Sequence, residues 1–444
     1  MKNIMIYIKG ELGTLIRKKR ISIIPFFIIW MSFVTGEAYG QARPAKPDIK
    51  NRQRIDLRDL GYLQVNEIPV NSSLITSLIT AGNGMIYGGT SGDDAYFFLF
   101  DPSINKVRHL GKIPMQTGIH HSLVEDKDGN IYIGTGKNMF EEVSLSKWGE
   151  GDENLDVTLW KDIKKHYNGY PGGHLYRYKP AVSNGTVKLA DMDCEVEDLG
   201  MPLANNSIYA LAMSPKGDEL YGLTYPDGHF FVYNISLNKI ADLGEIDNKK
   251  VYHGPERQWR TLPRALICDD SGRVFTSGTE GMLKYYDPEQ KKLITTEIEI
   301  PGDYYYYSPA YQDYTAVEYF AKNSKGIIYG GTTDGYLFSF DPNNMKLVNL
   351  GKVRASRRLR CLTVGKDDKV YLMAGERSVS RPCQFYSYDP ETGGFENLGL
   401  LIADRSPYYY WRGLQFDSMT TGSDGTVYVG ESERNSHLFI YIPQ

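Results

Sequence analysis

One short β-strand pattern recurs seven times along the chain and constrains the fold more than any other feature. Each copy is an apolar residue followed by Tyr or Phe, usually after a polar turn. The seven copies are Ile86-Tyr87, Ile131-Tyr132, Leu220-Tyr221, Val274-Phe275, Ile328-Tyr329, Val370-Tyr371 and Val427-Tyr428. Successive copies lie 45, 89, 54, 54, 42 and 57 residues apart, and the longest step is one ordinary period plus an insertion. Such a period is typical of repeat architectures.

Each period holds further strand and turn signals around this pattern. A third aromatic-rich strand follows it, and in four copies that strand ends in an Asp-Pro turn, at Asp101, Asp287, Asp341 and Asp389. A fourth strand often carries Leu-Gly, as at Leu110-Gly111. The apolar residues alternate with a period of two, which excludes a helical repeat. We therefore predict an all-β fold, a seven-bladed β-propeller with four-stranded antiparallel blades.

The two ends of the repeat predict how the ring closes. The last copy stops at Tyr441 after its third strand, so its blade lacks a fourth strand. A strand of the missing kind occurs near the N-terminus, at Leu57 to Leu63. We expect this N-terminal strand to pair onto the last blade, because closure removes the open edges that a linear array would leave.

The N-terminus reads as a targeting segment. A basic run, Arg17 to Arg20, precedes the apolar stretch Ile21 to Val34, and Ala38-Tyr39-Gly40 offers the small residues that signal peptidase requires. The apolar stretch is short for a membrane span, so we expect cleavage and a secreted or periplasmic protein without an integral span. The predicted organisation is a signal peptide at 1–40, a linker at 41–55 and the propeller at 56–444, with an insertion at about 137–173 in blade two.

The net charge of the chain bears on its binding partners, and its cysteine content bears on its disulfide state. The chain has a formal net charge of −4, and the segment up to Gly40 contributes six Lys or Arg against two Glu, so the remainder is near −8. An acidic chain disfavours nucleic acid as a partner. The 4 Cys are too few for a disulfide framework, which favours buried free thiols over one bridge. The sequence requires no cofactor and shows no metal-ligand motif, and it leaves a structural metal ion open as an alternative. We expect a monomer.

The predicted loops differ in length and composition between the two faces of the ring. The loops that enter first strands, and those between second and third strands, are long and rich in aromatic residues, Arg and His, whereas the other turns are short. Long loops in a compact fold tend to carry function. Four residues that stand where inner strands start are expected to converge on the central axis: His121, Arg264, Arg358 or Arg360, and Arg412. The residues predicted to bind substrate are His121, Trp259, Arg260, Tyr307, Arg358, Trp411 and Arg412.

These residue classes favour a ligand with carboxylates and flat apolar faces. Arg binds carboxylates bidentately and aromatic rings stack on sugars, so an acidic oligo- or polysaccharide is the predicted partner. Structural roles remain open for the same residues. Tyr304 to Tyr307 equally suit a cover over the blades, and an Arg where a strand starts suits an ion pair with a blade Asp or Glu. His229 begins a third strand, as do His174 and His437, which suits a shared structural device.

The assembled pattern resembles a family of secreted bacterial propellers, the ulvan lyases, and the related enzymes that cleave rhamnosyl–glucuronic acid linkages. The blade GIIYGGTTDGYLFSFDPNNMKLVNLG, Gly326 to Gly351, carries the resemblance best. It extends over nearly all of the chain after the signal peptide, and its motifs are architectural. The resemblance implies a lyase in which His or Tyr removes a proton from a uronic acid and Arg neutralises the carboxylate.

Carried onto this chain, the resemblance implies a catalytic set. His229 and His253 lie 24 residues apart, similar to the His pair of ulvan lyases. Arg260 or Arg264 would supply the cation, and one of Tyr304 to Tyr307, taken as Tyr305, the acid or base. The rhamnose-releasing branch carries a His at the start of its first blade, where this chain has Asn71-Ser72-Ser73-Leu74.

Two alternatives to a lyase stay open at this stage. One is a non-catalytic propeller that binds glycan or protein, and the other is a glycoside hydrolase of the rhamnosyl–glucuronate type. The sequence shows no cluster of converging carboxylates of the kind that a calcium-dependent lactonase or esterase would need. It also contains no GxSxG motif, which disfavours a serine hydrolase.

Overall fold

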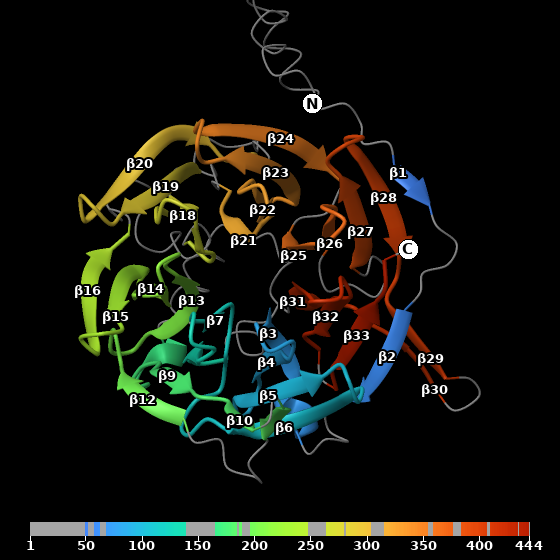
Figure 1. Cartoon of the computed structure of the whole chain (residues 1–444), viewed down its shortest axis with the longest axis horizontal. Coiled ribbons are helices and arrows are strands. Elements are labelled where there is room, and N and C mark those ends of the chain that lie inside the picture. The colour runs from blue at the N-terminus through green and yellow to red at the C-terminus, as the bar shows by residue number, and fades with distance from the viewer. Residues whose placement is uncertain are drawn as a thin grey trace, which may run out of the picture. The chain divides into compact units, whose positions relative to one another are not determined.

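The computed structural model describes a ring of four-stranded antiparallel sheets. The described residues are 49–51, 57–62, 68–138, 165–183, 186–188, 196–246, 263–278, 281–302, 315–353, 358–375, 383–405, 409–433 and 435–443. Figure 1 looks down the ring, with the first strand of each blade nearest the centre. The seven-bladed β-propeller predicted from the repeat is therefore confirmed, with almost no helix in the described part.

Each blade is a simple up-and-down meander, from the inner strand to the outer one. Blade one comprises β3 (Leu74–Thr80), β4 (Ile86–Ser91), β5 (Tyr96–Asp101) and β6 (Lys106–Lys112). Blade two comprises β7 (Leu123–Glu125), β8 (Ile131–Gly134), β9 (Leu175–Tyr178) and β12 (Val196–Gly200). Blade three comprises β13 (Ser207–Met213), β14 (Glu219–Tyr225), β15 (His229–Asn234) and β16 (Lys239–Glu245). Blades four and five comprise β17 (Ile267–Cys268), β18 (Val274–Ser277), β19 (Met282–Asp287) and β20 (Lys292–Glu299); and β21 (Val317–Lys322), β22 (Ile328–Thr332), β23 (Tyr336–Asp341) and β24 (Lys346–Lys352). Blades six and seven comprise β25 (Leu359–Val364), β26 (Val370–Ala374), β27 (Gln384–Asp389) and β28 (Gly394–Gly399); and β31 (Phe416–Thr421), β32 (Val427–Glu431), β33 (His437–Tyr441) and β2 (Leu57–Tyr62).

The N-terminal strand closes the ring as predicted. β2 pairs antiparallel with β33, with Leu57 opposite Tyr441 and Tyr62 opposite His437. It supplies the outer strand of blade seven, so chain segments from the two ends complete one sheet (Figure 1). This pairing covers the edge of β33 that the last repeat would otherwise leave open.

Seven apolar clusters hold neighbouring blades together, one between each pair, including blades seven and one. The aromatic residue that marks each repeat is a member of these clusters. All seven are at most 4% exposed: Tyr87, Tyr132, Tyr221, Phe275, Tyr329, Tyr371 and Tyr428. The repeated pattern is thus the core between blades, and each such ring contributes roughly 1.5–3 kcal/mol through burial.

Turn chemistry follows the sequence as well. At all four Asp-Pro turns the Asp carboxylate accepts a backbone N–H two residues further on, as at Asp101 and Asp341. This Asx turn lets one side chain fix the connection between third and fourth strands. Of the cysteines, Cys268, Cys361 and Cys383 are buried free thiols, as the sequence favours, and Cys194 lies outside the described residues.

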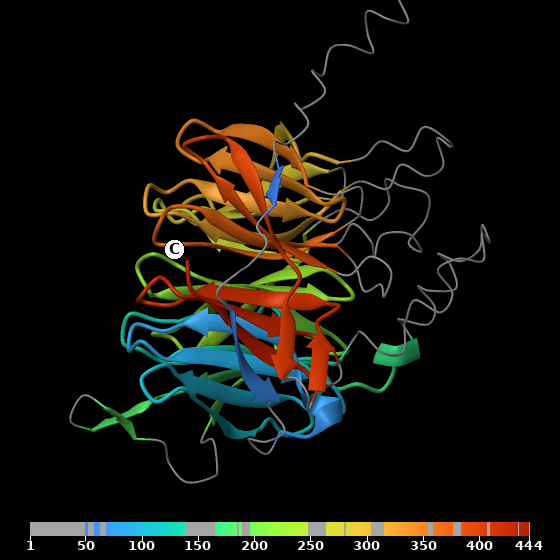
Figure 2. The same ribbon diagram turned by 90° about the vertical axis from the view of Figure 1, so that its right-hand side faces the viewer.

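Several elements lie outside the repeat pattern. β1 (Ile49–Asn51), within the predicted linker, pairs parallel with β28. The remaining elements are the hairpins β10 (Ala181–Ser183) with β11 (Thr186–Lys188) and β29 (Ile402–Arg405) with β30 (Tyr409–Arg412), the 3-10 turn η2 (Val70–Ser72) and a helical turn at 165–167. Figure 2 shows the 165–167 turn and the β10–β11 hairpin on opposite sides of the ring. The hairpin lies in the connection between the third and fourth strands of blade two, residues 179–195, so the prediction that the turns on this face are short is wrong in this blade.

The N-terminal segment predicted to be a signal peptide lies outside the described residues, so that prediction stays open. Among the residues that the structure describes, no helix is long and apolar enough to cross a membrane.

Candidate functional site

A ring of polar side chains surrounds the central axis at one level of the propeller. In five inner strands the pairing register shifts across a single residue, which leaves that residue unpaired. A bulge of this kind re-aims a side chain, here toward the axis. The five unpaired residues are Thr76, Tyr209, Glu318, Arg360 and Asp417. The equivalent positions in blades two and four are occupied by His121 and Arg264. We call these seven residues the polar ring.

Contacts between blades support this placement. Arg264 of blade four is bonded to Glu318 of blade five, and the rings of His121 and Tyr209 lie 5.9 Å apart between blades two and three. The carboxylates of Asp417 and Glu318 also raise the pKa of His121, against the larger effect of its burial. The side chains of five blades therefore act on one another around a common axis.

The polar ring has a sequence signal. Each member lies ten residues before the apolar residue of the recurring pattern in six blades, and eleven before it in blade three, as with His121 and Ile131 or Tyr209 and Leu220. Aligning the seven repeats on that pattern would have placed all seven positions together. The prediction from residue class found His121 and Arg264, left Arg360 as an alternative to Arg358, and missed Tyr209, Glu318 and Asp417.

Glu318 is the centre of a charge cluster that joins blades four and five to the residue preceding blade six. Arg358 donates to both of its oxygens, with Nε 2.8 Å from Oε1 and Nη2 3.0 Å from Oε2. Arg264 adds a third bond, from Nη1 to Oε1 at 3.1 Å. Burial alone would raise the pKa of Glu318, but the guanidiniums of Arg358 and Arg264 outweigh it and lower that pKa to about 2. The carboxylate is therefore ionised at neutral pH.

Backbone geometry fixes Arg358 in this position. Its φ of 66° lies in the left-handed region, which bulky residues seldom adopt. Its N–H donates to Thr333 at 2.9 Å, and its carbonyl accepts from Gly375 at 3.2 Å. An unfavourable backbone conformation held by its surroundings is common at binding and catalytic sites.

A second ion pair lies in blades six and seven. Arg360 donates through Nε to Asp417, and Gln415 donates to the other carboxylate oxygen at 3.0 Å. Both partners of the ion pair are buried, with side chains at most 6% exposed. Burial would raise the pKa of Asp417, but Arg360 holds it below its ordinary value.

Two consecutive histidines face an aromatic cluster. His120 stacks on Tyr209 at 5.0 Å and bonds the Lys137 carbonyl at 3.0 Å, while His121 meets the Tyr319 ring edge-on at 4.9 Å. Burial lowers the pKa of His120 to about 4 and also lowers that of His121. Both imidazoles are therefore neutral near pH 7. The His121 Nδ1 atom is buried and has no hydrogen-bond partner within the described part of the chain.

Trp411 lies in a separate cluster of blade seven. Its indole N–H donates to both oxygens of Glu431, at 2.8 and 3.0 Å, and its ring lies 5.3 Å from that of His437. His437 contacts the same carboxylate through Nδ1 at 2.8 Å. Arg412, the next residue on β30, is half-buried. The structure thus packs Trp411 against the blade.

His229 lies at the start of β15, two strands outward from the inner strand of its blade. Its Nδ1 contacts both oxygens of Asp242 on the neighbouring outer strand, at 3.0 and 2.9 Å. His174 makes the same contact with Asp198 in blade two. The structure therefore does not bring His229 together with Arg264. The remaining predicted site residues lie outside the described residues: His253, Trp259, Arg260, Tyr305 and Tyr307.

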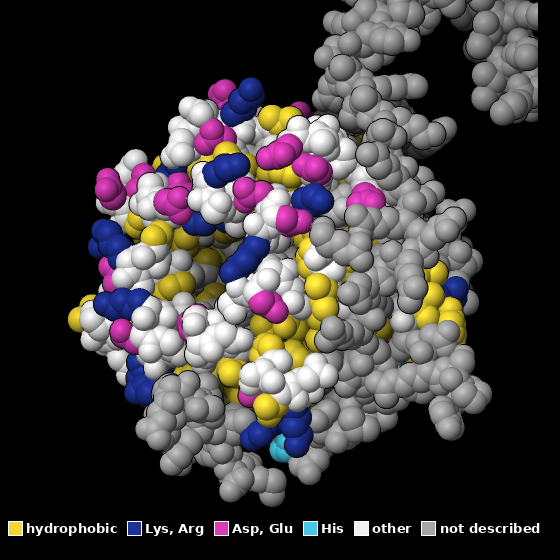
Figure 3. Space-filling model, turned by 45° about the vertical axis from the view of Figure 1, so that its right-hand side comes forward, with side chains coloured by type: hydrophobic (Ala, Val, Ile, Leu, Met, Phe, Trp, Pro, Cys, Tyr) yellow, Lys and Arg dark blue, Asp and Glu magenta, His cyan; other side chains and the backbone are white. Residues whose placement is uncertain are grey.

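On the face that Figure 3 displays, charged side chains are dispersed. Figure 3 shows Lys and Arg side chains intermixed with Asp and Glu over the face it displays, without an extended patch of one sign. Within the described ranges, no group of three or more His, Cys, Asp or Glu side chains is arranged to hold a metal ion. The charges that converge on one point are those of the polar ring and Arg358.

Comparisons with known proteins agree with the fold. A family model described as a two component regulator propeller matches residues 115–137. A streptogramin B lyase structure superposes with a TM-score of 0.55 at 10% identity, covering 87% of this chain and 97% of that one. A catalytically inactive virginiamycin B lyase from Staphylococcus aureus, with quinupristin, gives 0.54 at 9% identity, covering 88% and 100%. These likenesses show the fold alone. No curated protein sequence matches the chain significantly.

Proposed function

We propose that this protein is a lyase that acts on uronic-acid-containing glycans, with the polar ring as its active site. The observation that carries the proposal is His121, a neutral imidazole with an unpartnered buried nitrogen, close enough to the guanidiniums of Arg358 and Arg360 to feel their charge. A lyase of this class needs a neutral base and fixed positive charge beside the carboxylate. The polar ring and Arg358 supply both.

The proposed reaction is a β-elimination. His121 takes the proton from the carbon that bears the carboxylate, and the electron pair of that C–H bond forms a carbon–carbon double bond. The C–O bond on the adjacent carbon then breaks, and the leaving oxygen takes a proton. Arg358 and Arg264 stabilise the negative charge that builds up on the carboxylate during proton removal. No oxidant or reductant is consumed.

Tyr209 is the proposed proton donor. Burial raises the pKa of its phenol, so the hydroxyl is protonated at neutral pH. Its ring lies 5.9 Å from that of His121, close enough for both to act on one sugar. A neutral base beside a protonated acid is the arrangement that an elimination requires.

Charge at the site favours an anionic substrate. Arg264, Arg358 and Arg360 outnumber Glu318 and Asp417, so the site carries a net positive charge within a chain whose formal net charge is −4. A local excess of one sign attracts ligands of the opposite sign. Uronic acid chains combine such carboxylates with ring faces that suit Tyr209 and Tyr319.

The comparisons support the proposal only through the fold. Two proteins that share it at 9–10% identity are lyases by name, which indicates that a propeller of this kind can host elimination chemistry. Their substrates belong to those proteins. The proposal also includes export to the periplasm or medium and action as a monomer, as the sequence predicts.

One observation favours a second function, a propeller that binds acidic glycan without cleaving it. Arg264, Arg358 and Arg360 each already bond a carboxylate of the polar ring. A network whose charges are mutually neutralised can be purely structural. This alternative predicts binding without product, and the glycoside hydrolase alternative predicts release of a saturated sugar.

Incubation with a panel of uronic acid glycans tests the proposal. The product of β-elimination is an unsaturated uronate, whose conjugated double bond absorbs in the ultraviolet. We expect absorbance to rise with at least one glycan and the rise to be lost in Tyr209→Phe. Saturated products only, or binding with no product across the panel, would reject the lyase.

A further inference from the structure

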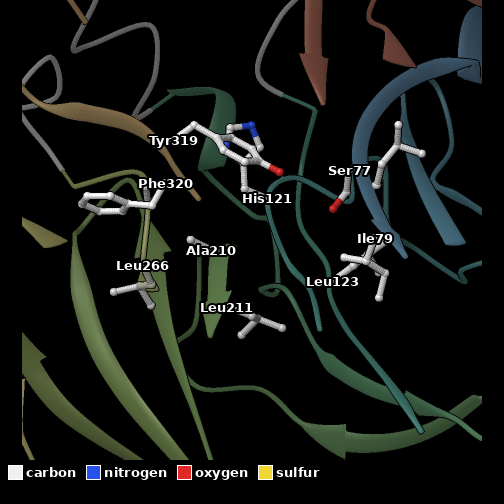
Figure 4. Close-up of a pocket in the computed structure, with 11 residues that line it drawn as sticks. Ser77, Ile79, His121, Leu123, Ala210, Leu211, Leu266, Tyr319 and Phe320 are labelled. Carbon is white, nitrogen blue, oxygen red and sulfur yellow. The ribbon is translucent and has the colours of Figure 1, made fainter. Parts of the chain in front are cut away.

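A cavity of about 160 Å³ lies along the central axis next to the polar ring. Ser77, Ala210 and Ala265 line it, and each directly follows a polar-ring position on its inner strand. His121 and Tyr319 line it as well, so it is continuous with the proposed active site. Figure 4 shows Ser77, Ala210, His121 and Tyr319 around the open space. The small residues at three of these positions keep the space open.

Polar side chains gather at one end of this cavity. Figure 4 shows the hydroxyl groups of Ser77 and Tyr319 turned toward each other, with His121 beside them. The Tyr319 hydroxyl also reaches across the axis to the Met419 carbonyl, at a long 3.5 Å. The His121 Nδ1 is unpartnered in the described part of the chain. A ligand with hydroxyl groups would satisfy these atoms.

The rest of the lining combines backbone polarity with apolar side chains. The inner strands are the edges of their sheets, so backbone N–H and C=O groups on that edge face the axis. Some of these groups pair between blades, as where the Leu211 N–H donates to the His121 carbonyl at 3.2 Å, and those not paired in this way need water or a ligand as partners. Leu123, Leu211 and Leu266 add aliphatic surface. A sugar ring, which has hydroxyl groups at its edge and apolar C–H groups on its faces, matches this mixture of polar backbone and aliphatic side chains. A purely apolar molecule does not match it.

The volume limits the ligand to one ring. A closed cavity of roughly 150 Å³ holds a single benzene ring, so this one, at about 160 Å³, has room for about one six-membered ring. We propose that the cavity binds the terminal sugar ring of the glycan, with its hydroxyls at Ser77, His121 and Tyr319. This inference rests on the proposed function and deepens it, because the lyase then acts at chain ends and releases one ring at a time.

Calorimetric binding of free D-glucuronic acid, with D-glucose as the neutral probe, tests the cavity without any turnover. We expect the unmodified protein to bind glucuronic acid and Ser77→Leu, which fills the polar end, to bind it about tenfold more weakly or worse. Tyr319→Phe keeps the shape, removes one hydroxyl and weakens binding by a smaller factor. Ser339→Leu, on the third strand of blade five, is the matched control and leaves binding unchanged.

The length of the first products provides the second readout. We expect single rings from the earliest times, and internal cuts in the glycan chain would contradict action at chain ends. Loss of binding in Ser77→Leu without turnover on any glycan retains the cavity site and rejects the lyase. Turnover with internal cuts, and binding unchanged in Ser77→Leu and Tyr319→Phe, rejects the cavity site and retains the lyase. Failure of the unmodified protein to bind either sugar also overturns the cavity site.

Discussion

The guanidinium of Arg358 forms a fork with the carboxylate of Glu318, with Nε 2.8 Å from Oε1 and Nη2 3.0 Å from Oε2. Glu318 lies on the inner strand of blade five, and Arg358 directly precedes the inner strand of blade six. The pair therefore joins two blades at the axis. The side chain of Glu318 is only 2% exposed, so the solvent screens this interaction weakly.

Replacing Glu318 tests how much this junction contributes. Glu318→Gln leaves the guanidiniums of Arg358 and Arg264 without their carboxylate, and removing one partner of a buried pair costs about 3–5 kcal/mol. Urea unfolding measures the loss. The control is Glu197→Gln, which breaks an exposed pair with Arg177 and should cost less than about 1 kcal/mol. Equal effects for both variants would show that Glu318 has no special weight.

Acid should weaken the protein through the same carboxylate. The pKa of Glu318 is about 2 in the folded protein, against an ordinary 4.5. The folded state thus holds this proton more weakly than the unfolded state does. The stabilisation is fully present above pH 4.5 and is lost as the pH falls toward 2. Thermal unfolding across this range should show a steeper loss for the unmodified protein than for Glu318→Gln, and parallel curves would contradict the assignment.

Gly222 is required by the packing of blade three. A Cβ at this position would lie 2.1 Å from the ring of the buried Phe231, and the same arrangement recurs at Gly88 with Phe98. Gly222→Ala should therefore destabilise the fold by about 1–3 kcal/mol through overpacking. A Cβ at Gly82 would lie 3.5 Å from its nearest neighbour, a carboxylate oxygen of Glu125. Gly82→Ala should therefore change the free energy of unfolding by no more than about 0.5 kcal/mol. Similar unfolding midpoints for the two variants would refute this.

The closing strand offers a test of the ring. A chain that begins at residue 68 lacks β2 and exposes the edge of β33, whereas one that begins at residue 57 keeps the strand. We expect the shorter chain to melt lower by several degrees, roughly 2–4 °C per kcal/mol lost. It should also associate through the open edge. Calorimetry and size-exclusion chromatography compare the two, and identical behaviour would show that closure contributes nothing.

Much of the fold could be predicted because the repeat is itself the core. The residues that mark it, such as Tyr87 and Tyr428, are the rings buried between blades, and the missing fourth strand of the last blade pointed to Leu57. The short parallel strand β1 could not be predicted in the same way. It pairs with β28, more than 300 residues away, and carries no repeated pattern.

The candidate site was predictable in part. His121 and Arg264 stand where inner strands start, and chain position together with residue class indicated them. Glu318 and Asp417 were missed because the prediction followed Arg, His and aromatic residues, while the carboxylates that bind those Arg belong to other repeats. The pairing of each Arg with its acid depends on contacts between blades, and the paired residues are 40 or more positions apart in the sequence. A spacing of ten residues from the repeat, or eleven in blade three, would have found the positions, but not the pairs.

The most direct test of the account is the activity of His121→Ala on the glycan that gives the strongest ultraviolet signal, with folding checked by thermal melting. His174→Ala, which removes an outer His paired with Asp198, is the matched control. A general base contributes about 10²–10⁴-fold to the rate. We predict a loss of that size in His121→Ala and near-normal activity in His174→Ala. Full activity in a folded His121→Ala protein would contradict the central claim that the polar ring is the active site.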